Sequence, residues 1–288
     1  MIAWDAEIVQ SIARRRSVVM VGSGVSRNSV NKDGKRPPTW EGFLKDASKA
    51  IGSPPHIEAL IAQRDYLTAC ELVKRRITND AFVTLVQREY QQAGYQAATI
   101  HKHIYDLDSS IVASPNFDQI YDTYAGNASH GTVVVKDHTS SDIVRYLGGG
   151  ETRLLLKTHG SANNPNKLIF TRKDYAEART KHVLFYEILK SLALTHTFLF
   201  LGCGIDDPDI RSLFEDVQFA HERMPVHYMT TPRGEVNDDV LTVAAETMKV
   251  KFLSYAPDNG HEELTLSLAE LVKQVDAAKD ALAGNRNW

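Results

Sequence analysis

Short apolar runs that alternate with amphipathic helical stretches constrain the fold of this chain more than any other feature. The runs are rich in β-branched and aromatic residues, and the alternation is clearest in the second half of the sequence. They predict strands at 17–21, 110–114, 131–135, 153–157, 197–201, 226–230 and 250–253. Strands that alternate with helices form a mostly parallel sheet with helices on both faces. The predicted fold class is therefore α/β.

A long helical segment interrupts this alternation after the first predicted strand. Helices are predicted at 4–15, 172–194, 208–222, 236–248 and 261–282. Residues 54–108 also carry apolar side chains at helical spacing, and Thr39 is placed to cap a helix that starts at Trp40. We therefore expect a single domain over residues 1–288, with a helical subdomain inserted at about 40–108.

The composition excludes several classes of protein. The 33 Lys and Arg residues nearly balance the 36 Asp and Glu residues, so we expect no direct binding to nucleic acid or to an anionic membrane surface. Two cysteines, Cys70 and Cys203, cannot build a disulfide framework or a four-thiolate zinc site within one chain. No apolar run approaches the ~20 residues of a membrane span, and the N-terminus lacks the order of a signal peptide. We expect a cytoplasmic protein without a metal.

Four unusual motifs each follow a predicted strand, and ligands of open parallel sheets bind outside the carboxyl ends of the strands. The first motif comprises Gly22, Ser23, Gly24, Val25 and Ser26. Glycines let the backbone approach a diphosphate, and backbone N–H groups bind the anion. The motif lacks the third glycine of the dinucleotide fingerprint and the lysine of a P-loop, so a simple tight turn is the alternative.

The second and third motifs place polar side chains beyond the strands at 110–114 and 153–157. Asn116 and Asp118 are two residues apart and suit a carboxamide or a ribose hydroxyl, although turn and capping chemistry would use the same residues. His159 directly follows an apolar run and precedes a glycine, which is a suitable place for a general base. The chain contains eleven histidines, so a structural role for this one is the alternative.

The fourth motif, Gly202, Cys203 and Gly204, follows the strand at 197–201. Asp207 and Pro208 next to it fit the cap and the first residue of a helix, so a well-capped turn is the alternative. Cys203 is not expected to be a nucleophile, because no basic partner is evident in the neighbouring sequence.

Taken in order, the four motifs resemble the sirtuin-like NAD-binding fold, which is Rossmann-like. Sirtuins carry Gly-Ala-Gly-Ile-Ser where this chain has the 22–26 motif, Asn-Ile-Asp where it has Asn116 to Asp118, and a His-Gly pair where it has His159. Their Gly-Thr-Ser loop corresponds loosely to residues 202–204. The zinc ribbon of the deacylase sirtuins and their Pro-Asp-Phe-Arg loop are absent.

Further motifs resemble the zinc-free sirtuin-like domains of bacterial antiphage defence, which hydrolyse NAD. They are the Pro-Thr-Trp that ends at Trp40, the Asn-Phe-Asp that ends at Asp118, and a stretch from Thr171 to Tyr175. Because the chain ends soon after the fold, it is most similar to the stand-alone type encoded with a HerA-type ATPase. The resemblance implies a homo-oligomer that depletes NAD+ within a complex with that ATPase.

The resemblance also implies roles for the motif residues. Asn116 would hold the ribose and orient a water, Asp118 would hold the nicotinamide carboxamide, and His159 would be the base. The turn from Gly22 to Ser26 would hold the diphosphate, and residues 202–204 would line the adenosine side. NAD+ would be the substrate, and no metal would take part.

The sequence is also compatible with three other functions. The same fold supports a protein deacylase or ADP-ribosyltransferase, and it supports a non-catalytic module that binds NAD or ADP-ribose. An ordinary Rossmann oxidoreductase is the third. It is disfavoured because the third glycine is missing and because Glu41, about 20 residues further on, falls in a predicted helix instead of at the end of a second strand.

Overall fold

The computed structural model describes residues 1–147, 152–204, 208–221 and 224–285, and it is built around a seven-stranded sheet. The strands are β1 (Ser17–Val21), β2 (Ile111–Ser114), β3 (Val134–Asp137), β4 (Leu154–Lys157), β5 (Thr197–Leu201), β6 (His227–Pro232) and β7 (Val250–Tyr255). They lie in the order β3-β4-β2-β1-β5-β6-β7, and all the paired strands are parallel. The predicted α/β fold with a mostly parallel sheet is confirmed.

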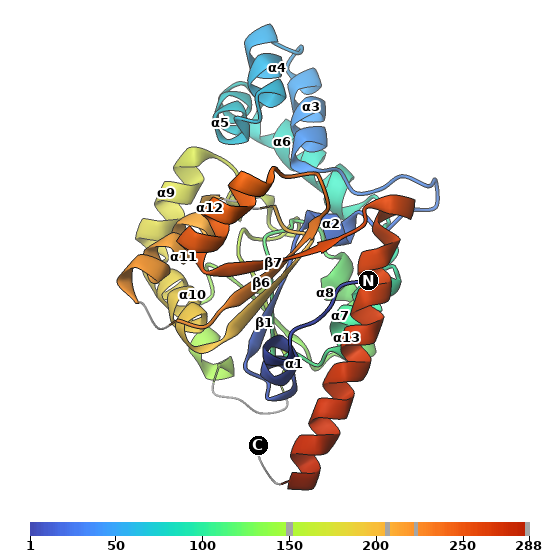
Figure 1. Ribbon diagram of the computed structural model, residues 1–288. Helices are drawn as coiled ribbons and strands as arrows, with labels where there is room; N and C mark the ends of the chain where they lie inside the picture. The colour runs from blue at the N-terminus through green and yellow to red at the C-terminus, as the bar shows by residue number, and fades with distance from the viewer. Residues whose placement is uncertain (148–151, 205–207, 222–223, 286–288) are drawn as a thin grey trace.

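Helices cover both faces of the sheet because successive residues of its buried strands point to opposite sides (Figure 1). On one face, Val18, Met20, Phe198 and Phe200 pack in a hydrophobic core with four helices. These helices are α9 (Arg172–Lys181), α10 (Val183–Thr195), α11 (Pro208–Ala220) and α12 (Asp238–Met248).

The intervening strand residues, Val19, Val21, Leu199 and Leu201, belong to the core on the opposite face. The helices on that side are α1 (Ala6–Ala13), α7 (Thr99–Asp106), α8 (Ile120–Ala128) and α13 (Asp258–Asn285). The long α13 packs along α1 and α7 (Figure 1), and the Trp4 indole donates a hydrogen bond to the Ser267 carbonyl at 2.8 Å. The N-terminal segment is thereby joined to α13 in one layer.

A third core lies in the helices that project beyond the sheet in Figure 1. They are α3 (Trp40–Ala50), α4 (Pro55–Ala62), α5 (Tyr66–Arg76) and α6 (Asn79–Val86), and α6 continues into a π-helical turn, η1 (Gln87–Gln91). As expected, Thr39 caps α3, because its hydroxyl accepts the Gly42 amide at 3.2 Å. The 40–108 segment contributes to two layers, since α7 packs on the sheet and α3 to α6 pack with one another.

Two predicted boundaries are wrong. The strand expected at 131–135 begins at Val134, because Gly131 takes a left-handed conformation (φ 84°) and its amide bonds back to the Gly126 carbonyl to close α8. The helix expected at 172–194 is two helices, because His182 (φ −114°, ψ 44°) leaves the helical conformation. Its ring packs against that of His138, with 5.0 Å between centroids.

The remaining short elements are α2 (Ser23–Ser26) and two 3₁₀ turns, η2 (Ile143–Tyr146) and η3 (Pro165–Lys167). In the described part of the chain, no helix has the length and apolar character that a membrane span requires.

Candidate active site

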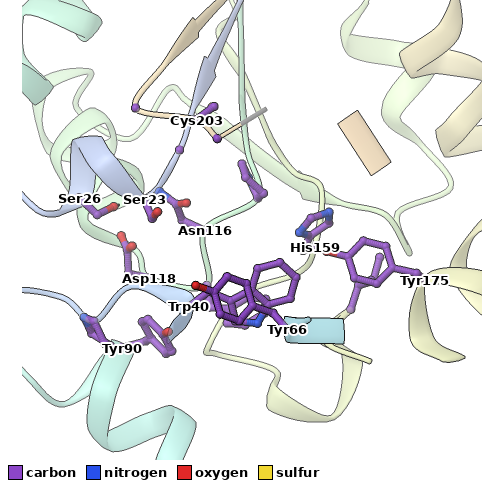
Figure 2. Close-up of a pocket in the computed structure, with 17 residues that line it drawn as sticks. Ser23, Ser26, Trp40, Tyr66, Tyr90, Asn116, Asp118, His159, Tyr175 and Cys203 are labelled. Atoms are coloured by element: carbon purple, nitrogen blue, oxygen red, sulfur yellow. Dashed lines mark hydrogen bonds between the residues drawn. The ribbon is translucent and has the colours of Figure 1, made fainter. Parts of the chain in front are cut away.

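The candidate site lies at the switch point of the sheet. Within the sheet, β2 lies next to β1 on one edge of that strand, and β5, which comes later in the chain, lies next to β1 on its other edge. Ligands of open α/β sheets bind at such a point, outside the carboxyl ends of the strands. A pocket of about 280 Å³ opens there. Its lining includes these residues of the four predicted motifs: Gly22, Ser23, Ser26, Asn116, Asp118, His159, Gly202, Cys203 and Gly204 (Figure 2).

The two glycine turns are pressed against each other. The Gly22 amide donates to the Leu201 carbonyl and the Gly24 amide to the Gly202 carbonyl, both at 2.9 Å. A Cβ on Gly22 would lie 2.4 Å from the Gly202 oxygen. Gly202 has a positive φ of 61°, and a Cβ there would lie 2.5 Å from the Val25 nitrogen. Glycine is therefore required at both turns by their close approach.

This packing occupies backbone amides that the sequence analysis assigned to the diphosphate of a ligand. The Gly22, Gly24 and Val25 amides all donate to carbonyl groups of the two turns. Gly24 and Val25 do not line the pocket, and the Val25 side chain is fully buried in the core. Ser23 and Ser26 are the members of the motif whose side chains are placed on the pocket (Figure 2).

Asn116 is held in the turn that follows β2. Its side-chain amide donates a hydrogen bond to the Ser26 hydroxyl at 3.0 Å, which orients the amide group within the pocket (Figure 2). Its backbone amide donates to the Ser114 hydroxyl at 3.2 Å, and that hydroxyl donates to the Val21 carbonyl at 2.9 Å. Asn116 is thus fixed to β1 as well as to its own strand.

Asp118 belongs both to the turn that precedes α8 and to the pocket. Its Oδ1 accepts the amide of Ile120, the first residue of α8, at 3.1 Å, so the alternative of turn chemistry describes a real contact. Its side chain is buried and lines the same pocket as Asn116. The carboxylate therefore lies within reach of a polar group of a ligand beside Asn116.

His159 lies two residues beyond β4 and is buried at the opposite wall of the pocket (Figure 2). Its ring packs edge-on against the ring of Tyr175, with 5.1 Å between centroids. Its carbonyl accepts the Ile169 amide at 3.1 Å, which fixes the backbone. Burial lowers the pKa of the nearby His138 to about 4, so His138 is neutral at pH 7 and places no positive charge behind His159.

Sequence reasoning missed an aromatic wall that the helical insertion supplies to the pocket. Trp40, Tyr66 and Tyr90 line it, from the start of α3, the start of α5 and the π-helical turn η1 (Figure 2). The rings of Trp40 and Tyr66 are 5.6 Å apart, and the Trp40 indole donates to the Cys70 sulfur at 3.2 Å. Nothing in the sequence separates these residues from other apolar positions of amphipathic helices, apart from the Pro-Thr-Trp motif at Trp40.

Cys203 lies at the pocket. Its thiol points to the Met20 and Leu201 carbonyls, at 3.6 and 3.7 Å. Asp207, the predicted cap of α11, lies outside the described residues. Among the residues that the structure describes, no group of three or more His, Cys, Asp or Glu side chains is arranged to hold a metal ion.

Comparison with known proteins places the chain in a family. Residues 110–253, half of the chain, match the SIR2-like domain. The chain is 22% identical over 222 residues to the NAD(+) hydrolase ThsA of Enterococcus faecium. The aligned segment covers 76% of this chain and 44% of that protein. It is 24% identical over 218 residues to the defense-associated sirtuin 2 of Bacillus subtilis, and this aligned segment covers 74% of the chain and 20% of that protein.

A second NAD(+) hydrolase ThsA, from Acinetobacter baumannii, is 24% identical over 123 residues, which is 43% of this chain and 25% of that protein. The chain thus matches less than half the length of each of these relatives. The matched segment runs from just before β2 to β7, and it contains Asn116, Asp118, His159 and the second glycine turn. The protein therefore belongs to the family of SIR2-like domains.

Proposed function

We propose that this protein is an NAD+ glycohydrolase, which uses water to cleave NAD+ to nicotinamide and ADP-ribose. The observation that carries the proposal is the convergence of Asn116, Asp118 and His159 with both glycine turns in one pocket at the switch point of a SIR2-like domain. The names of two relatives, both NAD(+) hydrolases, support the same reaction.

In the proposed mechanism the bond between C1′ of the ribose and the pyridinium nitrogen breaks, and its electron pair neutralises the nicotinamide. Because nicotinamide leaves as a neutral molecule, the leaving group needs no proton, and the enzyme must mainly hold the ribose and position a water. Asn116, which Ser26 orients, holds the ribose and the water. The water oxygen bonds to C1′, and His159 accepts its proton.

The other residues of the pocket bind the rest of the substrate. Asp118 accepts a hydrogen bond from the carboxamide of nicotinamide, and its buried position beside the aromatic wall suits a planar ring with a polar substituent. Ser23 and the adjacent turn contact the diphosphate. Gly202, Cys203 and Gly204 line the side on which the adenosine lies.

Chromatography of the products formed from NAD+ tests the proposal. Purified protein is incubated with NAD+ alone and with an acetylated peptide, and a His159→Ala protein is the control. Equal amounts of nicotinamide and ADP-ribose, independent of peptide, are expected. Acetyl-ADP-ribose formed only with peptide would indicate a deacylase, NADH would indicate an oxidoreductase, and unchanged NAD+ that nevertheless binds would indicate a regulatory module.

We further propose that the reaction serves bacterial antiviral defence by depleting NAD+ in the cytoplasm, where that cofactor is used. The name of the Bacillus relative, a defense-associated sirtuin, supports this role. An unregulated NAD+ hydrolase would deplete its own host, so we propose a homo-oligomer whose activity depends on assembly with a HerA-type ATPase. Light scattering of the purified chain, and turnover with and without that ATPase, test this. A monomer that is fully active alone would contradict it.

A further inference from the structure

Lys157, the last residue of β4, is buried with its charge inside the protein. Its side chain is about 2% exposed. The ammonium donates to the Asp118 carbonyl at 2.7 Å and lies 3.3 Å from Oδ1 of Asp122 on α8. Burial raises the pKa of Asp122, and the Lys157 ammonium opposes that rise. A buried ion pair often stabilises a fold no more than apolar residues of similar volume would, so stability alone does not explain why this pair is present.

The group that Lys157 holds is the turn that carries Asn116 and Asp118. Other contacts fix the rest of that turn: the Asn116 amide bonds to Ser114, and the Phe117 carbonyl accepts the Ala162 amide at 2.8 Å. Lys157 fixes its far end at the Asp118 carbonyl. Since His159 is only two residues beyond Lys157, this lysine joins the backbone segment that carries His159 to the segment that carries Asn116.

We propose that Lys157 is a positioning residue, which sets the Asn116–Asp118 turn against His159 through the Asp118 carbonyl while Asp122 balances its charge. This inference rests on the proposed function of the pocket. Lys157 does not itself line the pocket, so its effect on catalysis is transmitted through the turn.

A merely structural ion pair would give the same contacts, so the test must separate the two roles. Lys157→Met leaves Asp122 buried without its cation, which destabilises the fold. The double variant Lys157→Met/Asp122→Asn removes both charges and retains similar volume, so it leaves neither an unpaired buried charge nor a steric clash. A structural pair predicts that activity returns with stability in the double variant. A positioning lysine predicts that stability returns alone.

The experiment measures kcat and KM for NAD+, the thermal midpoint, and hydrogen exchange at the backbone amides within residues 114–120, where Pro115 has none, in each protein. In the double variant we expect a thermal midpoint close to that of the wild type. We expect kcat to fall by about 100-fold, with a smaller change in KM, because a displacement of about 1 Å has that effect on a reaction that depends on orientation. Amide exchange in the Asn116 turn should be faster than in the wild type.

Lys136→Met is the matched control. Lys136 lies on the neighbouring strand β3, and its ammonium pairs with Asp142 at 2.7 Å, away from the pocket lining. Its replacement should leave kcat and exchange at residues 114–120 unchanged.

Two results would overturn the proposal: recovery of wild-type kcat in the stable double variant, or unchanged exchange at residues 114–120. If the wild-type protein releases no nicotinamide from NAD+, the proposed function fails. Exchange in the double variant still decides whether Lys157 holds the turn.

Discussion

At the scale of single residues, His159 tests the proposed chemistry most directly. General-base assistance is worth about 100–10,000-fold, so we expect His159→Ala to lower the rate of nicotinamide release within that range. The thermal midpoint shows whether the variant remains folded, and His130→Ala, an exposed histidine after α8, is the matched control. Turnover near the wild-type rate in a folded His159→Ala protein would refute the assignment.

Asn116 is expected to act on the rate more than on binding. We predict that Asn116→Ala abolishes turnover but still binds NAD+ in calorimetry, because lost positioning of the ribose and water raises the barrier. Ser26→Ala should lower the rate by a smaller factor, since it removes the partner that orients the amide. Asn127→Ala, an exposed asparagine on α8, is the control. Complete loss of NAD+ binding in Asn116→Ala would mean that the amide acts in ground-state binding.

The sequence identifies residues of the candidate site where they closely follow a strand, but it does not show the long-range contacts that the site also needs. Asn116, Asp118 and His159 lie within five residues of predicted strands, and topology alone brings such positions to one edge of the sheet. Gly24 is explained by a contact with Gly202, almost 180 residues away, which no local pattern reveals. Tyr90 reaches the pocket from a π-helical turn, a geometry that helical periodicity does not distinguish from an ordinary helix.

At the scale of elements, the helical insertion contributes to binding through its aromatic wall. We predict that Trp40→Ala raises KM for NAD+ by about 5- to 10-fold, which corresponds to about 1–1.4 kcal/mol and is typical of an aromatic contact. Trp40→Phe keeps a planar ring and should retain most of the affinity. Steady-state kinetics measures both variants, and the thermal midpoint controls for the lost contact with Cys70. An unchanged KM in a folded Trp40→Ala protein would exclude the wall from substrate binding.

The elements themselves were predictable where burial alone decides the structure. β1 and β5 are buried at every residue, so their apolar runs identify them with their boundaries. β3 is partly exposed, and its sequence does not show where the strand starts after Gly131. The ring of His182, where the helix breaks, packs against that of His138, which is distant in the sequence, so the sequence around His182 favours an uninterrupted helix.

At the scale of the whole molecule, the order of the strands in the sheet determines which motifs meet in one pocket. Alternating strands and helices predict a parallel sheet, but they do not state which strands are neighbours. The order β4-β2-β1-β5 at the centre of the sheet brings the four motif-bearing loops to one pocket. The resemblance in motif order anticipated this convergence, whereas composition and periodicity did not.

Two of the buried histidines, His138 and His227, have strongly lowered pKa values and couple the stability of the whole fold to pH. The His227 side chain is enclosed by the rings of Phe198 and Phe214, and its Nδ1 accepts the Phe198 amide at 3.1 Å. Burial lowers the pKa of His227 to about 3 and that of His138 to about 4, from an ordinary value of 6.5. Between about pH 4 and 6.5 the unfolded chain therefore binds protons at these positions that the folded protein does not bind.

The free energy of unfolding should consequently fall as the pH is lowered from 7 to 5, with each histidine contributing up to about 1.4 kcal/mol per pH unit below 6.5. Urea denaturation at a series of pH values measures the slope. His227→Asn keeps an acceptor for the Phe198 amide but does not titrate. The slope of its unfolding free energy against pH should therefore be smaller than that of the wild type by the contribution of one histidine. His56→Asn, at an exposed position on α4, should leave the slope unchanged. An equal slope in His227→Asn and the wild type would show that His227 is protonated in the folded protein, against the burial that its position between the two phenylalanine rings imposes.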